Sequence, residues 1–301
     1  MNETQDPEGA GARQSAGPAA GATRIAPGLH LVSTPIGAAR DITLRALDVL
    51  AGAEVLAAED TRTLRRLMEI HGIPLAGRPL IAYHDHNGAQ ARPRLLALLA
   101  EGRSIAYASE AGTPLVADPG FQLARAAIAQ GQAVLAAPGA SAVLAALAVG
   151  GLPTDRFCFV GFPPAQGGVR KSWLAEVTVI PATLVLYESP KRIHRLLDEL
   201  AEHGEREVAL CRELTKRFEE VIRGSLADVR MVIAGRELKG EIVLLLGQAE
   251  ARDAAVDLDG LLRAALAGSS LREAVDAVTG ATGLPRRQVY QRALALGKGE
   301  E

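Results

Sequence analysis

Aromatic residues and net charge are both scarce in this sequence of 301 residues. Phe, Trp and Tyr together make up 3% of the chain, which excludes a nucleic-acid surface built from rows of stacking rings. The formal net charge of -2 argues against a protein that coats nucleic acid non-specifically, but it leaves room for a local basic groove. Hydrophobic residues at 48% and charged residues at 23% are typical of a soluble globular enzyme, long enough for two domains and a small third piece.

Cysteines and long apolar runs are also nearly missing. Cys158 and Cys211 lie far apart, and neither has a CxxC partner or a histidine cluster at zinc spacing, so no metal site is expected. This cysteine usage favours a reducing cytoplasm. No apolar run reaches the roughly 18 residues that a membrane span needs, so no membrane association is expected.

The first 26 residues lack any periodic apolar pattern. They are rich in Gly, Ala, Gln and Pro and contain no apolar core of the kind that signal peptides have. We therefore interpret residues 1–27 as a disordered tail that precedes the first folded domain.

Short apolar runs alternate with helical patterns from residue 29 onward. This alternation is typical of βαβ units and predicts a mostly parallel sheet with both faces covered. The stretch "GGLPTD" at 150–155 breaks the pattern, so the first α/β domain is expected over 28–150. Its expected strands are 29–33, 54–58, 80–84, 104–109 and 133–139, and its expected helices are 42–52, 61–71, 89–101, 119–130 and 141–149.

A second α/β domain is expected over 151–248. Its later strands lie close together, and "CRELTKRFEEVIRG" at 211–224 is typical of a hairpin, so the second sheet is expected to be mixed. Helix 190–202 carries a single apolar stripe that faces a core. The expected strands are 157–162, 183–189, 207–214, 219–224 and 241–247.

A polar linker and a small helical domain over 255–301 complete the predicted organisation. Ser270 and Glu273 are spaced as a capping box, Gly280 is placed to stop that helix, and Pro285 stands near the start of the next. We expect two helices joined by a tight turn.

The common phosphate and dinucleotide fingerprints are absent. No GxGxxG follows a predicted strand, and neither GxxxxGK[ST] nor GxSxG occurs. These absences argue against a Rossmann nicotinamide site, a P-loop and a nucleophile elbow.

Three loops of small residues stand instead at the ends of predicted strands: "STPIG" (33–37), "SEAGTP" (109–114) and "PGAS" (138–141). In an open parallel sheet, ligands bind outside the carboxyl ends of the strands, and Gly and Pro let backbone groups approach a ligand closely. Any one of these loops could be an ordinary turn between strand and helix. Three of them on one edge indicate a ligand site.

The loops belong to a longer series of ordered motifs: "LVSTPIGAARDIT", "AAEDTR", "HDHN", "SEAGTPLVADPG", "PGASA", "DRFCFVGF", "YESPKR" and "RELTK…KGEIVLLL". Over roughly 29–247 this series resembles the ribosomal small-subunit methyltransferase I family of the tetrapyrrole-methylase superfamily. The tail resembles the small helical domain that some members carry. One position departs from the family pattern, since Glu110 stands where the family has Asp.

The resemblance implies two α/β domains with S-adenosylmethionine folded in the cleft between them, and a homodimer. It implies 2′-O-methylation of a cytidine in the decoding region of 16S rRNA within the 30S subunit. It also implies cofactor contacts from the strand-end loops and from the second domain, at Pro35, Ile36, Gly112, Thr113, Leu115, Val116, Ser141, Ala142, Tyr187, Leu210 and Glu241.

The ribose hydroxyl is weakly acidic, so this reaction benefits from a general base. The candidates among the motifs are Glu59, Asp60, His84 and Glu188, with Asp85, His86 and Glu110 beside them, and the sequence does not rank them. His84 and His86 are expected on opposite sides of an extended chain, which favours a polar lining over a metal pair. Glu188 suits a substrate pocket, or else it is an acid favoured at a helix N-terminus.

Basic residues near the same strand ends are candidates for RNA contacts: Arg62, Lys191, Arg192, Lys216 and Arg217. Lys216 and Arg217 stand at a hairpin tip, where a charged turn that keeps a sheet edge soluble is the alternative. Arg65 and Arg66 are assigned to a solvated helix face. A basic face on the last helix, at Arg286, Arg287 and Arg292, is either a recognition surface or a solubilising one.

Two other functions share parts of this pattern. A methyltransferase acting on a tetrapyrrole or another small substrate would have the same fold and cofactor loops. A non-catalytic RNA-binding module for ribosome assembly would have the basic residues without needing a cofactor.

Overall fold

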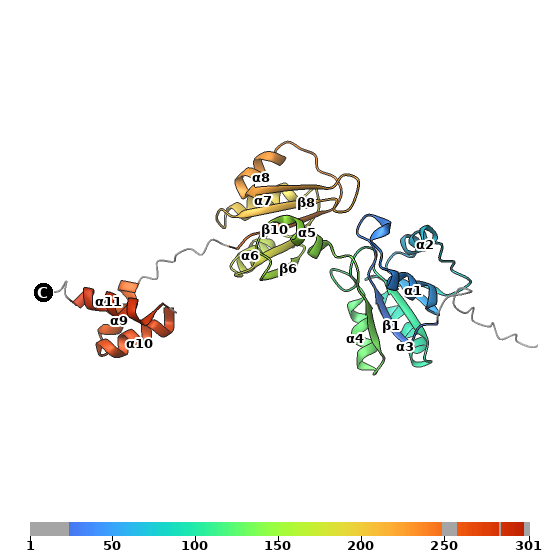
Figure 1. Ribbon diagram of the computed structural model, residues 1–301, viewed down its shortest axis with the longest axis horizontal. Coiled ribbons are helices and arrows are strands. Elements are labelled where there is room, and N and C mark those ends of the chain that lie inside the picture. Colours follow the sequence, from blue (N-terminus) through green and yellow to red (C-terminus); the bar gives the residue numbers. More distant parts are fainter. Residues whose placement is uncertain (1–23, 249–257, 283, 298–301) are drawn as a thin grey trace, which may run out of the picture. The chain divides into compact units, whose positions relative to one another are not determined.

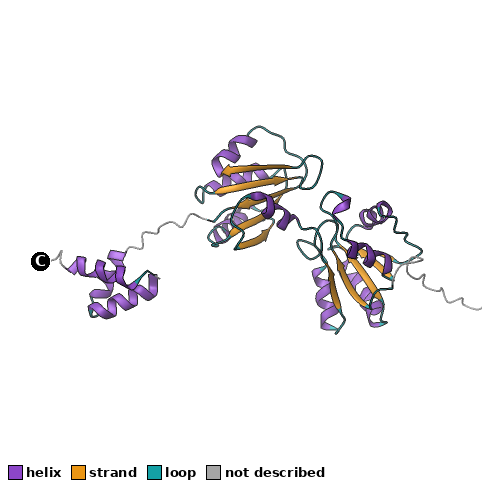
Figure 2. Cartoon of the chain, viewed as in Figure 1, coloured by secondary structure: helices purple, strands orange, loops and turns teal. Residues whose placement is uncertain are grey.

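The computed structural model describes residues 24–248, 258–282 and 284–297 (Figures 1 and 2). The described residues fall into two compact units, one that ends at Gly247 and one formed by the C-terminal helices. Most of the expected N-terminal tail and of the expected linker lie outside the described residues. No helix in the described parts of the chain is long and apolar enough to cross a membrane.

The first sheet is parallel throughout, which confirms the prediction from the alternating pattern. In spatial order its strands are β3 (Leu80–Ala82), β2 (Val55–Ala58), β4 (Ser104–Ala108), β1 (Gly28–Val32) and β5 (Val134–Ala137). Because all five strands run the same way, their carboxyl ends and the loops that follow them lie along one edge of the sheet.

Four helices cover this sheet, two on each face. One apolar cluster joins α1 (Leu44–Gly52) and α2 (Thr61–Ile70) to one side of the strands. A second cluster joins α3 (Gly88–Ala100) and α4 (Phe121–Ala129) to the other side. The neighbouring strands β1 and β4 therefore lead to helices on opposite faces, and such a switch point is where open sheets bind ligands.

Helix α5 (Ala142–Gly150) follows β5 but covers the second sheet rather than the first. Its residues Val143, Ala146 and Leu147 pack with Val185 and Leu245 in one apolar cluster. The approach is close, since a Cβ on Gly150 would lie 2.2 Å from Cδ1 of Leu245. The expected domain boundary at 150 thus divides a helix from the sheet that it covers.

The second sheet is mixed, as expected. Its strands lie in the order β6 (Phe157–Gly161), β7 (Thr183–Glu188), β10 (Ile242–Leu246), β8 (Glu207–Arg212) and β9 (Glu220–Ser225). Only β6 and β7 pair in parallel, and β8 and β9 form the expected hairpin. Helix α7 (Ile193–Ala201) buries its apolar stripe against this sheet.

Two helices of this part were not expected from the sequence. Helix α6 (Gly167–Val177) begins with two glycines and has no clear apolar stripe, and α8 (Leu226–Ile233) starts directly where β9 ends. The side chains of Ser225 and Asp228 form a capping box that starts α8. A short 3-10 helix, η1 (Ala39–Asp41), precedes α1.

In the described part of the C-terminal unit there are three helices rather than the two expected: α9 (Leu258–Leu266), α10 (Leu271–Thr282) and α11 (Arg286–Gly297). The predicted capping box is confirmed, because the Ser270 N–H donates to Oε2 of Glu273 at 2.9 Å. Gly280 does not end α10. Leu262 of α9 is fully buried in the shared core, so the third helix is needed to close it.

Candidate active site

A cavity of about 680 Å³ lies where the strand-end loops of the first sheet meet the second-sheet part of the same compact unit. The loops after β1, β4 and β5 all contribute to its wall, as their place on one sheet edge predicts. The lining residues from the first part of the chain are Pro35, Ile36, Gly37, Glu59, Thr63, Glu110, Ala111, Gly112, Thr113, Val116, Ala117, Asp118, Ser141 and Ala142. Those from the second part are Phe162, Tyr187, Glu188, Ser189, Pro190, Lys216, Gly240, Glu241, Ile242 and Val243.

The three strand-end loops are hydrogen-bonded to one another. The backbones of Thr34 and Gly112 exchange two hydrogen bonds, of 2.9 and 3.0 Å. The Thr113 hydroxyl donates to the Ala140 carbonyl at 3.0 Å. Gly112 therefore uses its amide and carbonyl inside the protein, and it shapes the cavity instead of presenting its backbone to a ligand.

The loop after Gly112 holds two non-glycine residues in the left-handed region, Leu115 (φ 71) and Ala117 (φ 54). Such strain persists only where the surroundings enforce it, and it gathers at functional sites. Here the side chain of Leu115 packs into the core under α4, whereas Val116 and Asp118 line the cavity.

Most of the residues expected at the cofactor line the cavity, with two exceptions. Leu115 packs away from it, as described above. Leu210 is fully buried in the core under α7 and α8, because it faces the opposite side of its strand from Ala209 and Cys211, which pack on α5. Ser141 lines the cavity and also caps α5, its hydroxyl accepting from the Leu144 N–H at 3.5 Å.

Glu59 follows β2 and is the lining carboxylate with the most altered acidity. Burial raises its pKa to about 7, and the negative charges of Asp118 and Glu110 add to that effect. The side chain takes part in no ion pair among the described residues. A carboxylate that titrates near neutral pH can accept a proton efficiently.

Asp60, the neighbouring candidate, is engaged in local structure. Its Oδ1 accepts from the Arg62 N–H at 2.7 Å and so caps α2, and its Oδ2 pairs with Nη2 of Arg62 at 2.9 Å. These hydrogen bonds lower the pKa of Asp60 to about 2. Asp60 is therefore a weak base, and the exposed Arg62 is bound to it.

Glu188 lies at the cavity wall, but both of its carboxylate oxygens are already occupied. Oε2 pairs with Nη1 of Arg170 at 3.2 Å, and Oε1 pairs with Nε of Arg192 at 3.1 Å. Oε1 also accepts from the Ser189 N–H at 2.8 Å. Arg192 also donates to the Pro163 carbonyl, so its contacts stabilise the local fold around Glu188. The neighbouring Lys191 is exposed.

Asp118 is an acidic cavity residue that was not singled out from the sequence. Asp118 accepts at Oδ1 from the Tyr107 hydroxyl and from the Gly120 N–H, each at 2.8 Å. Its Oδ2 is buried and has no partner in the described structure. The available signal was the "DPG" at 118–120, an acid that closes a turn at the start of α4.

Residues 28–230 match the family model described as Tetrapyrrole (Corrin/Porphyrin) Methylases, and residues 252–297 match one described as RsmI C-terminal HTH domain. The chain is 45% identical to the Ribosomal RNA small subunit methyltransferase I of Mesorhizobium japonicum, over 90% of this chain and 93% of that protein. It is 42% identical to the protein of that name from Xylella fastidiosa, over 87% and 97%. The chain belongs to the ribosomal RNA small subunit methyltransferase I family. The resemblance carried by the ordered motifs is thereby confirmed.

The fold of this methyltransferase is also shared with a solved structure. The crystal structure of the methyltransferase CobJ superposes with a TM-score of 0.57 at 22% identity, covering 73% of this chain and 94% of that one. At this identity the likeness shows the fold alone. It confirms the expected arrangement of two α/β parts.

The two histidines of the methyltransferase lie together, which corrects the expectation of opposite sides. The ring centroids of His84 and His86 are 6.0 Å apart. Strand β3 ends at Ala82, and a turn follows in which Oδ1 of Asn87 accepts from the His84 N–H at 2.8 Å. In the described residues no group of three or more His, Cys, Asp or Glu side chains could hold a metal ion.

Lys216 at the hairpin tip belongs to the cavity wall of the methyltransferase. Its Nζ donates to Oε1 of Glu213 and to Oε2 of Glu241, both at 2.8 Å. The adjacent Thr215 hydroxyl accepts from the Ala38 N–H at 3.2 Å, which joins the hairpin to the loop after β1. Arg217 instead lies over the exposed ring of Phe218, 5.5 Å from its centroid.

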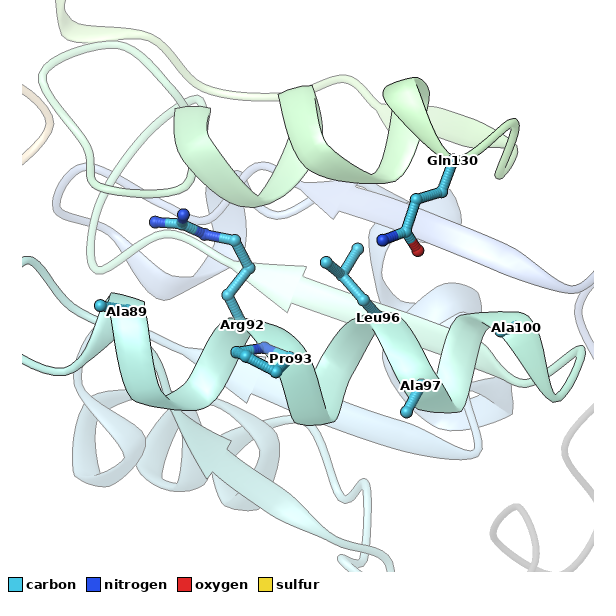
Figure 3. A pocket seen from close by; sticks show the side chains of 7 residues that line it. All are labelled: Ala89, Arg92, Pro93, Leu96, Ala97, Ala100 and Gln130. Atoms are coloured by element: carbon cyan, nitrogen blue, oxygen red, sulfur yellow. The ribbon is translucent and has the colours of Figure 1, made fainter.

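A second hollow of about 470 Å³ lies between α3 and α4 (Figure 3). Figure 3 shows Arg92 and Gln130 reaching towards the space between the two helices. No strand-end loop and no carboxylate lines this second hollow. The residue pattern of a methyl-transfer site is therefore found in the larger cavity.

Proposed function

We propose that this chain transfers a methyl group from S-adenosylmethionine to the 2′-hydroxyl of a cytidine ribose in the decoding region of 16S rRNA. The observation that carries this proposal is the cavity at the switch point, where burial raises the pKa of the lining Glu59 to about 7. The names of the relatives, which specify the small-subunit ribosomal RNA, support the substrate class. The 30S particle in the cytoplasm is then the substrate, and we propose a homodimer as the working form.

The cavity residues fit this cofactor. About 680 Å³ is within the usual range for small-molecule sites, roughly 300–1,000 Å³. Apolar walls suit a neutral adenine, and Phe162 and Tyr187 supply aromatic surface with ring centroids 5.4 Å apart. Glu241, held by Lys216, is placed to accept from ribose hydroxyls, and Asp118 offers an unsatisfied acidic oxygen. When bound, the cofactor supplies a methyl group already activated by its sulfonium charge.

Glu59 is the proposed general base. It accepts the proton of the ribose 2′-hydroxyl while that oxygen forms its bond to the methyl carbon, and such assistance is worth roughly 10²–10⁴-fold. The arginine partners of Asp60 and Glu188 favour Glu59 over these two carboxylates for this role. Much of the remaining rate enhancement comes from holding the two reactants in line, and the hydrogen-bonded loops provide that rigidity.

The proposed RNA contacts change in part from those expected. Three exposed residues remain candidates for phosphate contacts: Arg62, Lys191 and Arg217. Arg192 is assigned instead to holding Glu188 in place, and Lys216 to the cavity wall. The C-terminal helical unit, which matches a model with a helix-turn-helix name, is proposed to add to RNA binding.

Methyl transfer from labelled cofactor to 30S particles that lack the modification tests the proposal, with mapping of the labelled nucleotide. We expect label on one cytidine ribose of 16S rRNA for the wild-type protein and a loss of about 10²-fold or more for Glu59→Gln. Label on a base, on another RNA or on a tetrapyrrole would contradict the proposed reaction. Cofactor binding without transfer to any of these substrates would contradict the substrate class.

A further inference from the structure

The carboxylates that line the cavity fall into two groups. Glu188 and Glu241 each face a cation, from Arg170 and Arg192 in one case and from Lys216 in the other. The other lining carboxylates, Glu59, Glu110 and Asp118, form no ion pair in the described structure, and of these three only Asp118 has a buried oxygen without a hydrogen-bond partner.

Asp118 is held rigidly in this unpaired state. Its Oδ1 is fixed by the hydroxyl of Tyr107, which is fully buried and packs edge-to-face on Tyr83 with ring centroids 5.9 Å apart. The Tyr83 hydroxyl in turn accepts from Nε of Arg92 at 3.2 Å. A Cβ at Gly120 would lie 2.5 Å from Cε1 of Tyr107, so the turn that carries Asp118 tolerates no bulk.

The second oxygen of Asp118 is the unusual one. Oδ2 is buried and unpartnered in the described structure, and Asp118 is one of the residues that line the cavity. A buried polar oxygen without a partner is costly, and a negative charge more so. A ligand that carries positive charge would remove this cost on entering the cavity.

We propose that Asp118 makes the cavity selective for the cationic sulfonium cofactor over the neutral thioether product. The inference rests on the proposed function. In the transfer the methyl–sulfur bond breaks, the sulfur keeps the electron pair, the ribose oxygen bonds to the methyl carbon, and the hydroxyl proton passes to Glu59. The ligand thereby loses its sulfonium charge, and Asp118 loses its counter-charge, so that methyl transfer itself weakens retention of the product.

Calorimetry with S-adenosylmethionine and with S-adenosylhomocysteine separates charge from shape, since the two ligands differ by one methyl group and one charge. Asp118→Asn is the informative variant, because the amide oxygen can still accept from Tyr107 and Gly120. We expect this variant to bind the cationic ligand about tenfold more weakly, as one charge at several ångströms in a partly solvated site predicts, with less than about a twofold change for the thioether.

Two further variants provide matched controls. Tyr107→Phe removes one hydrogen bond but keeps the charge, and Asp118→Glu keeps the charge on a longer side chain. Both should retain most of the wild-type ratio of the two affinities. Should Asp118→Asn fail to fold, the wild-type ratio still decides, because a preference based on charge falls as salt is raised.

The proposal would be overturned if Asp118→Asn bound both ligands more weakly by the same factor. It would also be overturned if neither this variant nor salt changed the ratio of the two affinities. A loss of the preference in Tyr107→Phe as large as in Asp118→Asn would show that Asp118 acts through the fold alone. Wild-type protein that binds neither ligand would instead refute the proposed function.

Discussion

The backbones of Thr34 and Gly112 are joined by two hydrogen bonds, of 2.9 and 3.0 Å, which tie the loop after β1 to the loop after β4. Gly112 has a φ of +79°, and a Cβ there would lie 3.3 Å from Cγ2 of Ile36 on the cavity floor. The link therefore depends on a residue without a side chain. It sets the spacing of two loops that the proposed cofactor must fit between.

Gly112→Val should abolish cofactor binding and destabilise the protein by about 1–3 kcal/mol, because valine is strained at this φ and crowds Ile36. Calorimetry and thermal unfolding measure the two effects. Gly131→Val is the matched control, since Gly131 also has a positive φ (+71°) but nothing lies within 4 Å of its Cβ position. That variant should lose stability and keep its affinity. Unchanged affinity in Gly112→Val would refute the loop assignment.

Glu59→Gln should lower kcat by about 10²–10⁴-fold with little change in cofactor affinity. In the wild-type protein the base must be ionised, so the rate of transfer should rise with pH through about 7, the pKa of Glu59, and then level off. Single-turnover transfer across a pH series gives the profile. The control is Asp60→Asn, which removes the negative charge while the amide oxygen can still cap α2, and it should cost less than about tenfold. A larger loss there than in Glu59→Gln would reverse the assignment.

Glu59→Gln should also make the protein more stable at alkaline pH. The pKa of Glu59 is about 7 when folded, above the ordinary value of 4.5, so ionisation favours the unfolded chain. Wild-type stability should therefore fall relative to the variant between about pH 4.5 and 7 and stay lower above it. Because the side chain is only partly buried and water screens it, we expect a difference of about 1 kcal/mol. Denaturant unfolding at pH 5 and pH 8 measures it, and an equal difference at both would contradict the raised pKa.

Arg170→Met should destabilise the protein by about 3–5 kcal/mol, because it leaves the buried Glu188 carboxylate without its full partner set. The side chains of Arg170 and Glu188 are 1% and 0% exposed. Arg195→Ala is the control. Its ion pair with Glu199 is of the same kind, but the Arg195 side chain is 57% exposed, so a cost of less than about 1 kcal/mol is expected. Similar losses in the two variants would show that burial does not govern this network.

Arg62→Ala should weaken RNA binding, whereas Lys216→Ala should weaken cofactor binding. The side chain of Arg62 is 90% exposed. Its loss should weaken RNA binding and make the log–log slope of RNA affinity against salt shallower by about one, the equivalent of one phosphate contact. Cofactor affinity should stay unchanged. Lys216 holds Glu241 at the cavity wall, so its loss should weaken cofactor binding first. RNA binding across a salt series, together with calorimetry, distinguishes them. Arg65→Ala on the same helix is the control and should change neither, and an effect equal to that of Arg62→Ala would refute the placement of the RNA path.

The sequence by itself determined the parts of this protein that depend on local pattern. Alternating apolar runs and helical stripes predicted the parallel first sheet and the mixed second one, because side-chain periodicity reports which faces are buried. The three small-residue loops were placed on one edge, since parallel strands bring their carboxyl ends together. The ordered motifs identified the family before any geometry was known.

Only the tertiary structure distinguished the three candidate carboxylates from one another. Glu59, Asp60 and Glu188 look alike along the chain. Folding buries the first near other acids and pairs the others with arginines, which changes their acidity and access. A pKa depends on burial and on charges brought from distant positions, and no local pattern records these.

The same reason explains the other differences. The turn that brings His84 beside His86 depends on the Asn87 side chain, and α5 covers the second sheet because its apolar surface fits there. The Asp118 carboxylate is fixed by a hydrogen bond from the hydroxyl of Tyr107, eleven residues earlier in the sequence. Local preference sets which elements form, whereas the contacts between them set what each functional side chain faces.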